Sequence, residues 1–212
     1  MLAAERSLGP FPDYLIAVSR LLDQVESGNS VDIYLDGPDH GSLGDYGLHL
    51  QVRHSIKNAA VKGAAVRMLL PNELARVSRA NPQLEYWQQF ERVKETPGFK
   101  QFFEGQYSWF TQARSREEME VCIDTYMQVV LQDFIASNVG LKRLREDAEP
   151  LPFLFWRVQS EVIYVRLPQT PKEPAEARWT STAEDVDLFV SRFTALWNGG
   201  IPILNRSHDE RR

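Results

Sequence analysis

Three carboxylates and one histidine lie close together in the glycine-rich stretch between residues 36 and 45. These residues are Asp36, Asp39, His40 and Asp45, and they follow an apolar run, Ser30–Leu35, that is typical of a buried strand. Carboxylate and imidazole groups so close in sequence can act as a general acid and base or bind a divalent cation. The end of a parallel strand is also where open α/β sheets place their ligands. We therefore take the first three as candidate catalytic residues and Asp45 as a candidate ligand contact.

The same residue types also form ordinary tight turns, so a second interpretation stays open. Asp side chains bond to nearby backbone groups in turns, and Gly supplies the backbone freedom that turns need. The spacing does not match the calcium-binding loop Asp-x-Asp-x-Asp-Gly with a distal Glu. No metal ligand set and no cofactor is assigned from these residues.

A second candidate site lies on the helix predicted between residues 48 and 62. His54 and Lys57 are three residues apart and share a face, so together they can bind an anion near the start of this helix. The alternative is that they belong to the solvent-exposed face opposite Leu50 and Ile56. The glycines of this region form neither Gly-x-Gly-x-x-Gly nor a Gly-Lys-Ser/Thr phosphate loop.

Neither a nucleophile motif nor a nucleic-acid site stands out elsewhere. Ser42 lies near His40 without a Gly-x-Ser-x-Gly motif, and Cys122 falls within an apolar helical stripe. Aromatic residues between 86 and 110 alternate with Arg and Lys, a mixture that can stack nucleic-acid bases but is also typical of a core. The net charge of −5 gives no overall attraction to nucleic acid, so we do not expect nucleic acid as a partner.

Composition favours one domain in a reducing compartment. The 212 residues, 43% of them hydrophobic, suffice for one sizeable core. The only cysteine excludes an intramolecular disulfide, and no secretory signal segment is evident. No apolar run approaches the roughly 18 to 20 residues that span a bilayer. We expect a cytoplasmic protein without a membrane span, folded as a single domain over residues 1–205 with a polar tail at 206–212.

Helix and strand signals alternate along the chain, which predicts an α/β fold with a mixed, mainly parallel sheet and helices on both faces. A capping box, Ser115 to Glu118, marks the start of one long helix. Pro82 and Pro97 break the middle third into short helices. The expected helices cover residues 13–25, 48–62, parts of 73–105, 115–138 and 183–197; the expected strands cover 30–35, 64–70, 141–144 and the hairpin 152–167, which a Pro-rich linker follows at 168–174.

The order of these elements resembles one half of the phospholipase D-like superfamily. The likeness spans residues 12–197 and depends on the strand 31–35, the segment Gly63–Leu70, the aromatic hairpin and a closing helix that ends in Leu-Trp. Active members carry His-x-Lys-x-x-x-x-Asp on the hairpin; their His attacks phosphorus and their Lys holds phosphate oxygens. In the best register, Phe153, Phe155 and Ser160 stand where His, Lys and Asp would be.

This departure implies a module without phosphohistidine chemistry, because a phenyl ring has neither a lone pair nor a charge for phosphorus. Phe153 and Phe155 point to one face of a strand, so they can line a ligand pocket or a self-associating surface, or they can belong to the core. The resemblance also implies a homodimer, since half-folds of this type pair to complete a site. We expect a catalytically silent protein that binds a small ligand or a protein partner.

The alternative function is enzymatic. It is a metal-assisted phosphoesterase or another hydrolase that uses Asp36, Asp39, His40 and Asp45. The arrangement of this loop relative to the hairpin decides between the two interpretations.

Overall fold

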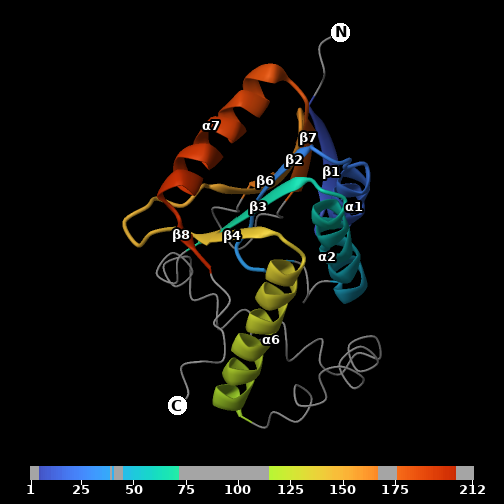
Figure 1. Cartoon of the computed structure of the whole chain (residues 1–212). Helices are drawn as coiled ribbons and strands as arrows, with labels where there is room; N and C mark the ends of the chain where they lie inside the picture. Colours follow the sequence, from blue (N-terminus) through green and yellow to red (C-terminus); the bar gives the residue numbers. More distant parts are fainter. Residues whose placement is uncertain (1–4, 39, 41–44, 72–114, 167–175, 204–212) are drawn as a thin grey trace.

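The protein is built around one eight-stranded sheet with helices on both faces (Figure 1). The structure is a computed structural model and describes residues 5–38, 40, 45–71, 115–166 and 176–203. The strand order is β1-β7-β6-β5-β2-β3-β4-β8. The strands are β1 Arg6–Pro10, β2 Ser30–Tyr34, β3 Ala65–Leu70, β4 Gly140–Arg143, β5 Phe153–Val158, β6 Glu161–Arg166, β7 Glu176–Thr180 and β8 Ile201–Pro202. The helices are α1 Tyr14–Asp23, α2 Tyr46–Val61, α6 Arg116–Ala136 and α7 Ala183–Gly199.

The mixed α/β fold predicted from sequence is confirmed, but parallel pairing is confined to the centre of the sheet. β2 pairs with β3, and β3 with β4, in parallel. The hairpin β5–β6 pairs antiparallel with β2 on one side and with β7 on the other, and β1 and β8 are antiparallel edge strands. The sheet is therefore less parallel than expected, because the hairpin β5–β6 and the strands β1, β7 and β8 all pair antiparallel with their neighbours.

Alternation along β5 divides the core into two layers. Phe155 faces α7, where its ring centroid lies 5.2 Å from that of Phe189. Trp156 faces the opposite layer, where it lies 6.0 Å from the ring of Tyr14 in α1. Because successive strand residues point to opposite faces, this places α7 on one face and α1, α2 and α6 on the other, among the helices that the structure describes (Figure 1).

Local sequence signals explain most of these elements. Apolar residues of α1 recur at helical spacing, and those on its inner face, such as Leu15, Val18 and Leu22, are buried. Gly63 has φ +92° where α2 gives way to β3. Ser115 accepts a hydrogen bond from the backbone N–H of Glu118, as the capping pattern predicts. The edge strands β1 and β8 carry no such signal and were not expected.

Three expectations fall on residues that the structure does not describe. These are the short helices within 73–105, the linker 168–174 and the tail 206–212. Of the helices that are described, none is both long and apolar enough to cross a membrane.

Candidate functional site

On the α7 side of the hairpin, the positions of the expected catalytic residues are filled by packed aromatic rings. Phe155 is completely buried, with its ring centroid 5.2 Å from Phe189 and 5.7 Å from Phe193. Phe153 is partly buried and lies 4.8 Å from Phe189 in an edge-on contact. The sequence left open whether these rings line a pocket or surface or belong to the core. Phe155 belongs to the core and does not line an open pocket.

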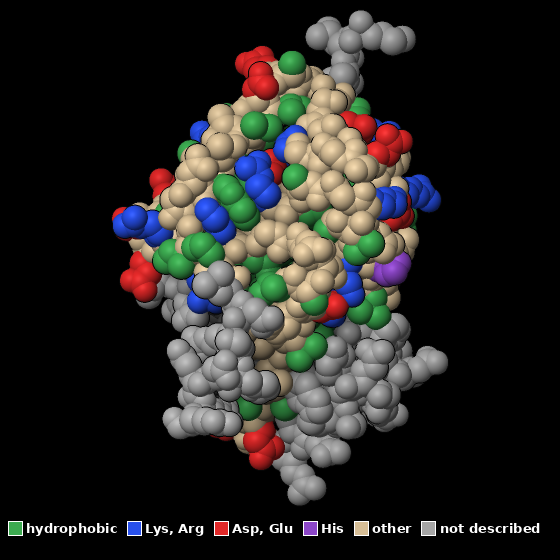
Figure 2. All heavy atoms as spheres, viewed as in Figure 1, with side chains coloured by type: hydrophobic (Ala, Val, Ile, Leu, Met, Phe, Trp, Pro, Cys, Tyr) green, Lys and Arg blue, Asp and Glu red, His purple; other side chains and the backbone are tan. Residues whose placement is uncertain are grey.

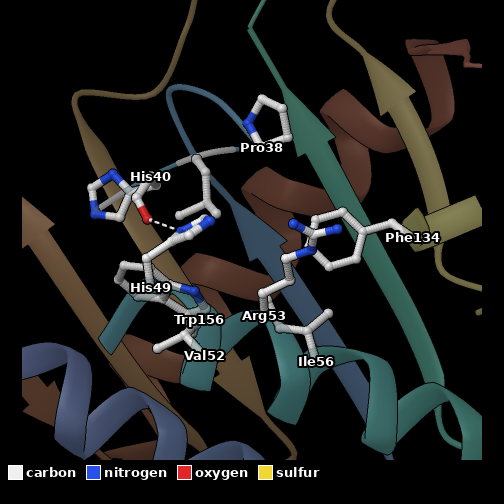
Figure 3. Close-up of a pocket in the computed structure, with 9 residues that line it drawn as sticks. Pro38, His40, His49, Val52, Arg53, Ile56, Phe134 and Trp156 are labelled. Atoms are coloured by element: carbon white, nitrogen blue, oxygen red, sulfur yellow. Dashed lines mark hydrogen bonds between the residues drawn. The ribbon is translucent and has the colours of Figure 1, made fainter. Parts of the chain in front are cut away.

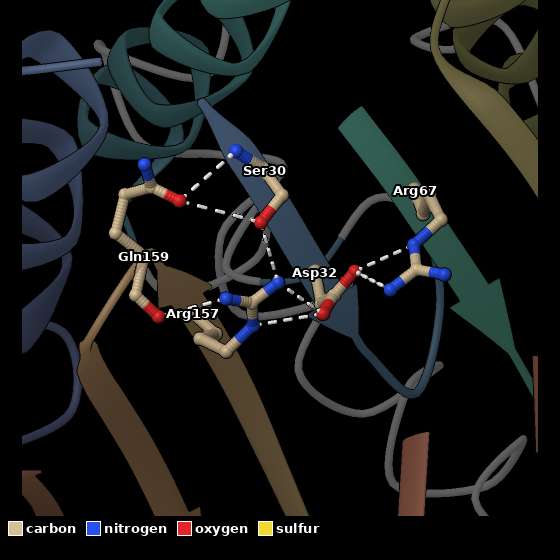
Figure 4. A network of polar contacts seen from close by, with 5 residues as sticks. All are labelled: Ser30, Asp32, Arg67, Arg157 and Gln159. Atoms are coloured by element: carbon tan, nitrogen blue, oxygen red, sulfur yellow. Dashed lines mark hydrogen bonds and ion pairs between the residues drawn. The ribbon is translucent and has the colours of Figure 1, made fainter. Parts of the chain in front are cut away.

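A buried charge network of strand residues lies on the same face (Figure 4), close to Phe193 and Trp197 of α7. Asp32 of β2 is completely buried between Arg157 of β5 and Arg67 of β3, at 2.6 Å and 2.7 Å. Arg157 also donates to the Ser30 hydroxyl and to the carbonyl oxygen of Gln159, the turn residue of the hairpin. The carboxylate therefore holds three central strands in register.

This network was not predicted from the sequence. Its signal was present, because Asp32, Arg67 and Arg157 each interrupt an otherwise apolar strand, and charged residues are seldom buried unless they are paired. Two cations share one carboxylate here, and the guanidinium of Arg67 lies 5.2 Å and 5.6 Å from the rings of Phe193 and Trp197. Figure 2 shows several Lys and Arg side chains on the face of the molecule that is turned to the viewer.

On the opposite face, the loop after β2 brings a carboxylate and a histidine together. His40 Nδ1 lies 2.8 Å from Asp36 Oδ1, and His40 Nε2 lies 2.8 Å from the hydroxyl oxygen of Tyr14. When Asp36 is ionised it can only accept, so Nδ1–H donates to it and the Tyr14 hydroxyl donates to Nε2. Burial, followed by the nearby Asp36 charge, raises the pKa of Tyr14, so this hydroxyl keeps its proton.

A second histidine continues this polar layer from α2. His49 is buried at 3% exposure; its Nδ1 donates to the backbone oxygen of His40 at 2.9 Å, and its Nε2 accepts from the Tyr126 hydroxyl of α6 at 3.1 Å. Asp45 begins α2 as its N-cap, since its side chain accepts from the backbone N–H of Leu48 at 2.9 Å. Asp45 therefore has a local structural role as the cap of this helix.

A small cavity lies between the sheet, α2 and α6, and His40 and His49 are among the residues that line it (Figure 3). Its volume is about 10 Å³, the space of about one water molecule. Figure 3 shows His40 and His49 on one side of it and Arg53 and Phe134 on the other. The residues that line it are Leu35, Pro38, His40, His49, Val52, Arg53, Ile56, Phe134 and Trp156. The indole nitrogen of Trp156 is buried and has no hydrogen-bond partner among the described residues.

Arg53 connects the cavity to a surface ion-pair group between α2 and α6. Arg53 Nε donates to Asp133 Oδ2 at 3.0 Å, and Lys57 Nζ donates to Asp133 Oδ1 at 2.7 Å. Partial burial acts to raise the pKa of Asp133, but the hydrogen bonds from Lys57 and Arg53 outweigh it and hold this pKa below its ordinary value. Lys57 is thus paired with a carboxylate, while His54, the other predicted anion contact, is exposed.

The predicted site residues therefore converge only in part. Asp36 and His40 meet the hairpin, since the His40 ring lies 5.5 Å from that of Trp156, but they do so on the face opposite Phe153 and Phe155. Asp39 lies outside the described residues, as does Ser42. Within the described ranges, no group of three or more His, Cys, Asp or Glu side chains is arranged to hold a metal ion.

Comparison with known proteins places the fold, and only the fold. No protein-family profile matches the chain. No curated protein matches it in sequence. Among solved structures, Nuc from Salmonella typhimurium, a phospholipase D family member, superposes with a TM-score of 0.51 at 11% identity over 95% of this chain and 99% of its own. The chain therefore has a phospholipase D-like fold, as its sequence predicted.

A second solved structure with this likeness is larger than the present chain. TrmBL2, an archaeal chromatin protein whose structure shows a novel mode of DNA binding, superposes with a TM-score of 0.51 at 10% identity over 94% of this chain. The match covers 54% of TrmBL2, so the chain spans about half the length of that protein.

NucT from Helicobacter pylori matches at 9% identity over 94% of this chain and 99% of its own, with a TM-score of 0.48.

Proposed function

We propose that this protein is a phospholipase D-like module that acts by binding and does not use phosphohistidine catalysis. The observation that carries the proposal is the burial of Phe155. In the register predicted from sequence, this residue stands where a phosphate-holding Lys would be, and its ring is enclosed by Phe189 and Phe193. A substrate phosphate needs a charged, accessible group at that position, and the side chain present is uncharged and inaccessible.

A phosphodiesterase assay tests this proposal. The purified chain is incubated with bis(4-nitrophenyl) phosphate, and the release of nitrophenolate is compared with that of Phe153→Ala and of buffer. We expect no release above buffer from either protein. Hydrolysis that depends on protein concentration and survives Phe153→Ala contradicts the proposal.

The second candidate function is hydrolysis at the pair formed by Asp36 and His40. The hydrogen-bonded series from Asp36 through His40 to Tyr14 favours it, because a carboxylate that orients an imidazole is a common arrangement in acid–base catalysis. Against it, both ring nitrogens of His40 already have partners, and the buried Tyr14 hydroxyl remains protonated.

Metal-dependent thermal stability separates the two functions. A metal-assisted hydrolase predicts that Mg²⁺, Mn²⁺ or Zn²⁺ raises the melting temperature and that His40→Ala removes the shift. His54→Ala is the matched control, since this histidine is exposed and lies outside the pair. The binding module predicts no shift that is specific to His40.

Self-association is part of the proposed binding role. It derives from the likeness to half-folds that pair, and light scattering at micromolar concentration tests it. A mass twice that of the 24.4 kDa chain supports the dimer, and a strict monomer removes this part of the proposal.

A further inference from the structure

Two cations gather around one indole ring at the carboxyl end of α7. Arg67 of β3 and Lys142 of β4 both lie over the ring of Trp197, at 5.6 Å and 4.9 Å from its centroid. β3 and β4 are parallel neighbours, and Lys142 pairs with Leu69, two residues beyond Arg67, so both cations face the same side of the sheet. All three side chains of this group are partly exposed, so a ligand in solution can reach them.

The guanidinium of Arg67 has one bonded edge and one free edge. Its Nε and Nη2 atoms lie 2.8 Å and 2.7 Å from Oδ1 of Asp32. Figure 4 shows the third nitrogen, Nη1, directed away from that carboxylate, and it has no acceptor among the described residues. Because the guanidinium is planar and has five N–H donors, Nη1 and the second hydrogen of Nη2 form a fork that fits two oxygens of a carboxylate or phosphate.

Positive charge exceeds negative charge around this group. Within the described ranges, Asp32 is the only carboxylate that forms an ion pair with Arg67 or Arg157, and Lys142 forms none. Lys142 Nζ donates instead to the carbonyl oxygen of Trp197, where the end of α7 carries about half a negative charge. Three cations thus face one carboxylate and one helix end. The Arg67 side chain is only 30% exposed, so solvent screens this excess incompletely.

We propose that the free edge of Arg67, together with the charge of Lys142, binds an oxyanion, the carboxylate or phosphate group of a small ligand. The fork supplies two directed hydrogen bonds, and Lys142 keeps two N–H donors beyond the one that it uses on Trp197. The site lies on the α7 face of the sheet, opposite the pair of Asp36 and His40. This inference rests on the proposed binding function and deepens it, since it names the ligand class.

The Nε–H group of Arg67 provides a direct measurement. It donates to the buried Asp32, which slows its exchange with water and keeps its resonance observable. The resonance is assigned through the side-chain carbons of the ¹³C,¹⁵N-labelled chain. The chain is then titrated with acetate and, separately, with inorganic phosphate, while sodium chloride holds the ionic strength constant. We expect a saturable shift of this resonance with at least one anion, because the anion binds the other edge of the same guanidinium.

The two anions distinguish the source of the oxyanion. Saturation with acetate alone identifies a carboxylate ligand, saturation with phosphate alone identifies a phosphate ligand, and saturation with both identifies the shared oxyanion; each result supports the site. Absence of a saturable Arg67 shift with either anion overturns the proposal. That failure leaves the non-catalytic function intact, because the phosphodiesterase assay tests it independently.

A matched pair of lysine variants tests the charge of the site. Lys142→Gln removes one cation and leaves the Arg67 fork in place, so we expect the dissociation constant of the anion to rise about fivefold. Lys62→Gln is the control, because Lys62 also donates from Nζ to carbonyl oxygens at the end of a helix, those of Asp23 and Val25 after α1. Its dissociation constant should equal that of the unmodified chain. Equal dissociation constants in the two variants contradict the proposal.

Discussion

Asp32 shows how one buried residue can determine the arrangement of three strands. It is fully inaccessible and accepts from Arg157 and Arg67, which belong to the strands on either side of β2. Taking these charges out of water costs several kcal/mol per ion, and the loss is offset only while the hydrogen bonds remain complete. The network is therefore a poor source of net stability but a strong requirement for the correct strand register.

We predict that Asp32→Asn lowers the free energy of unfolding by about 3 to 5 kcal/mol, because it leaves two arginines without their buried counter-charge. Urea denaturation measures the change. Asp147→Asn is the control, since its ion pair with Arg145 is exposed and should contribute about 1 kcal/mol or less. If both variants lose the same free energy of unfolding, the buried pairing of Asp32 is not a special requirement of the folded state.

Phe155 and Phe153 offer a second comparison at the scale of single residues. We predict that Phe155→Ala lowers the free energy of unfolding by about 3 to 5 kcal/mol, because it opens a cavity in a fully buried aromatic cluster. Phe153→Ala should cost clearly less, since this side chain is only partly buried. Urea denaturation of both variants gives the order, and the reverse order contradicts the packing described for the hairpin.

At the scale of elements, α7 is held at both ends by polar groups. At its start, Thr182 is the N-cap, and its hydroxyl accepts from the backbone N–H of Asp185 while donating to the carboxylate of the same residue. At its end, Lys142 of β4 donates to the carbonyl oxygen of Trp197 at 2.8 Å. A cation at a helix carboxyl terminus is favourable, and the last turn of α7 contains no basic residue of its own.

Removal of the cap should loosen this helix. We predict that Thr182→Ala lowers the free energy of unfolding by about 1 kcal/mol, the usual cost of losing an N-cap. Ser191→Ala, within the same helix, should change it by less than about 0.5 kcal/mol, because this serine is exposed. Chemical denaturation followed by circular dichroism measures both, and a Thr182→Ala effect no larger than that of Ser191→Ala argues against the cap.

At the scale of the whole molecule, Asp133 links the two helices that enclose the cavity. Its pKa is held below the ordinary value by Lys57 and Arg53, despite partial burial. A carboxyl group whose pKa is lowered by folding stabilises the folded state above its unfolded pKa, near 4, and that contribution disappears as the pH falls through the lower folded pKa. Acid should therefore weaken the contact between α2 and α6.

We predict that the melting temperature of the unmodified protein falls as the pH drops below about 4, and that Asp133→Asn falls less steeply over the same window. Asp185 should contribute to the remaining loss, because hydrogen bonds from Thr182 and Thr180 lower its pKa in the same direction. Thermal denaturation between about pH 6 and pH 3 measures both proteins. If the melting temperatures of the two proteins fall equally as the pH is lowered, protonation of Asp133 is not coupled to unfolding.

The sequence by itself determined the principal elements, because their signals are local. Helical spacing predicted α1 and α2, and two runs rich in β-branched and aromatic residues on either side of a polar break predicted the hairpin β5–β6, which pairs with β2. Edge strand β1 carries no local signal of its own, since its pairing with β7 joins segments that are far apart in the chain. The resemblance to the phospholipase D-like fold was readable for the same reason: it depends on the order of elements.

Only the tertiary structure decided how the candidate residues combine. Asp36 and His40 are neighbours in sequence and remain so in space, but Trp156, His49 and Arg53 join them through packing of separate strands and helices. The sequence left open whether the loop and the hairpin come together, and it could not tell that they meet on the face opposite Phe153. Which face a side chain occupies depends on strand register, and register here is set by long-range pairing and by the buried charge of Asp32, both of which exist only in the folded chain.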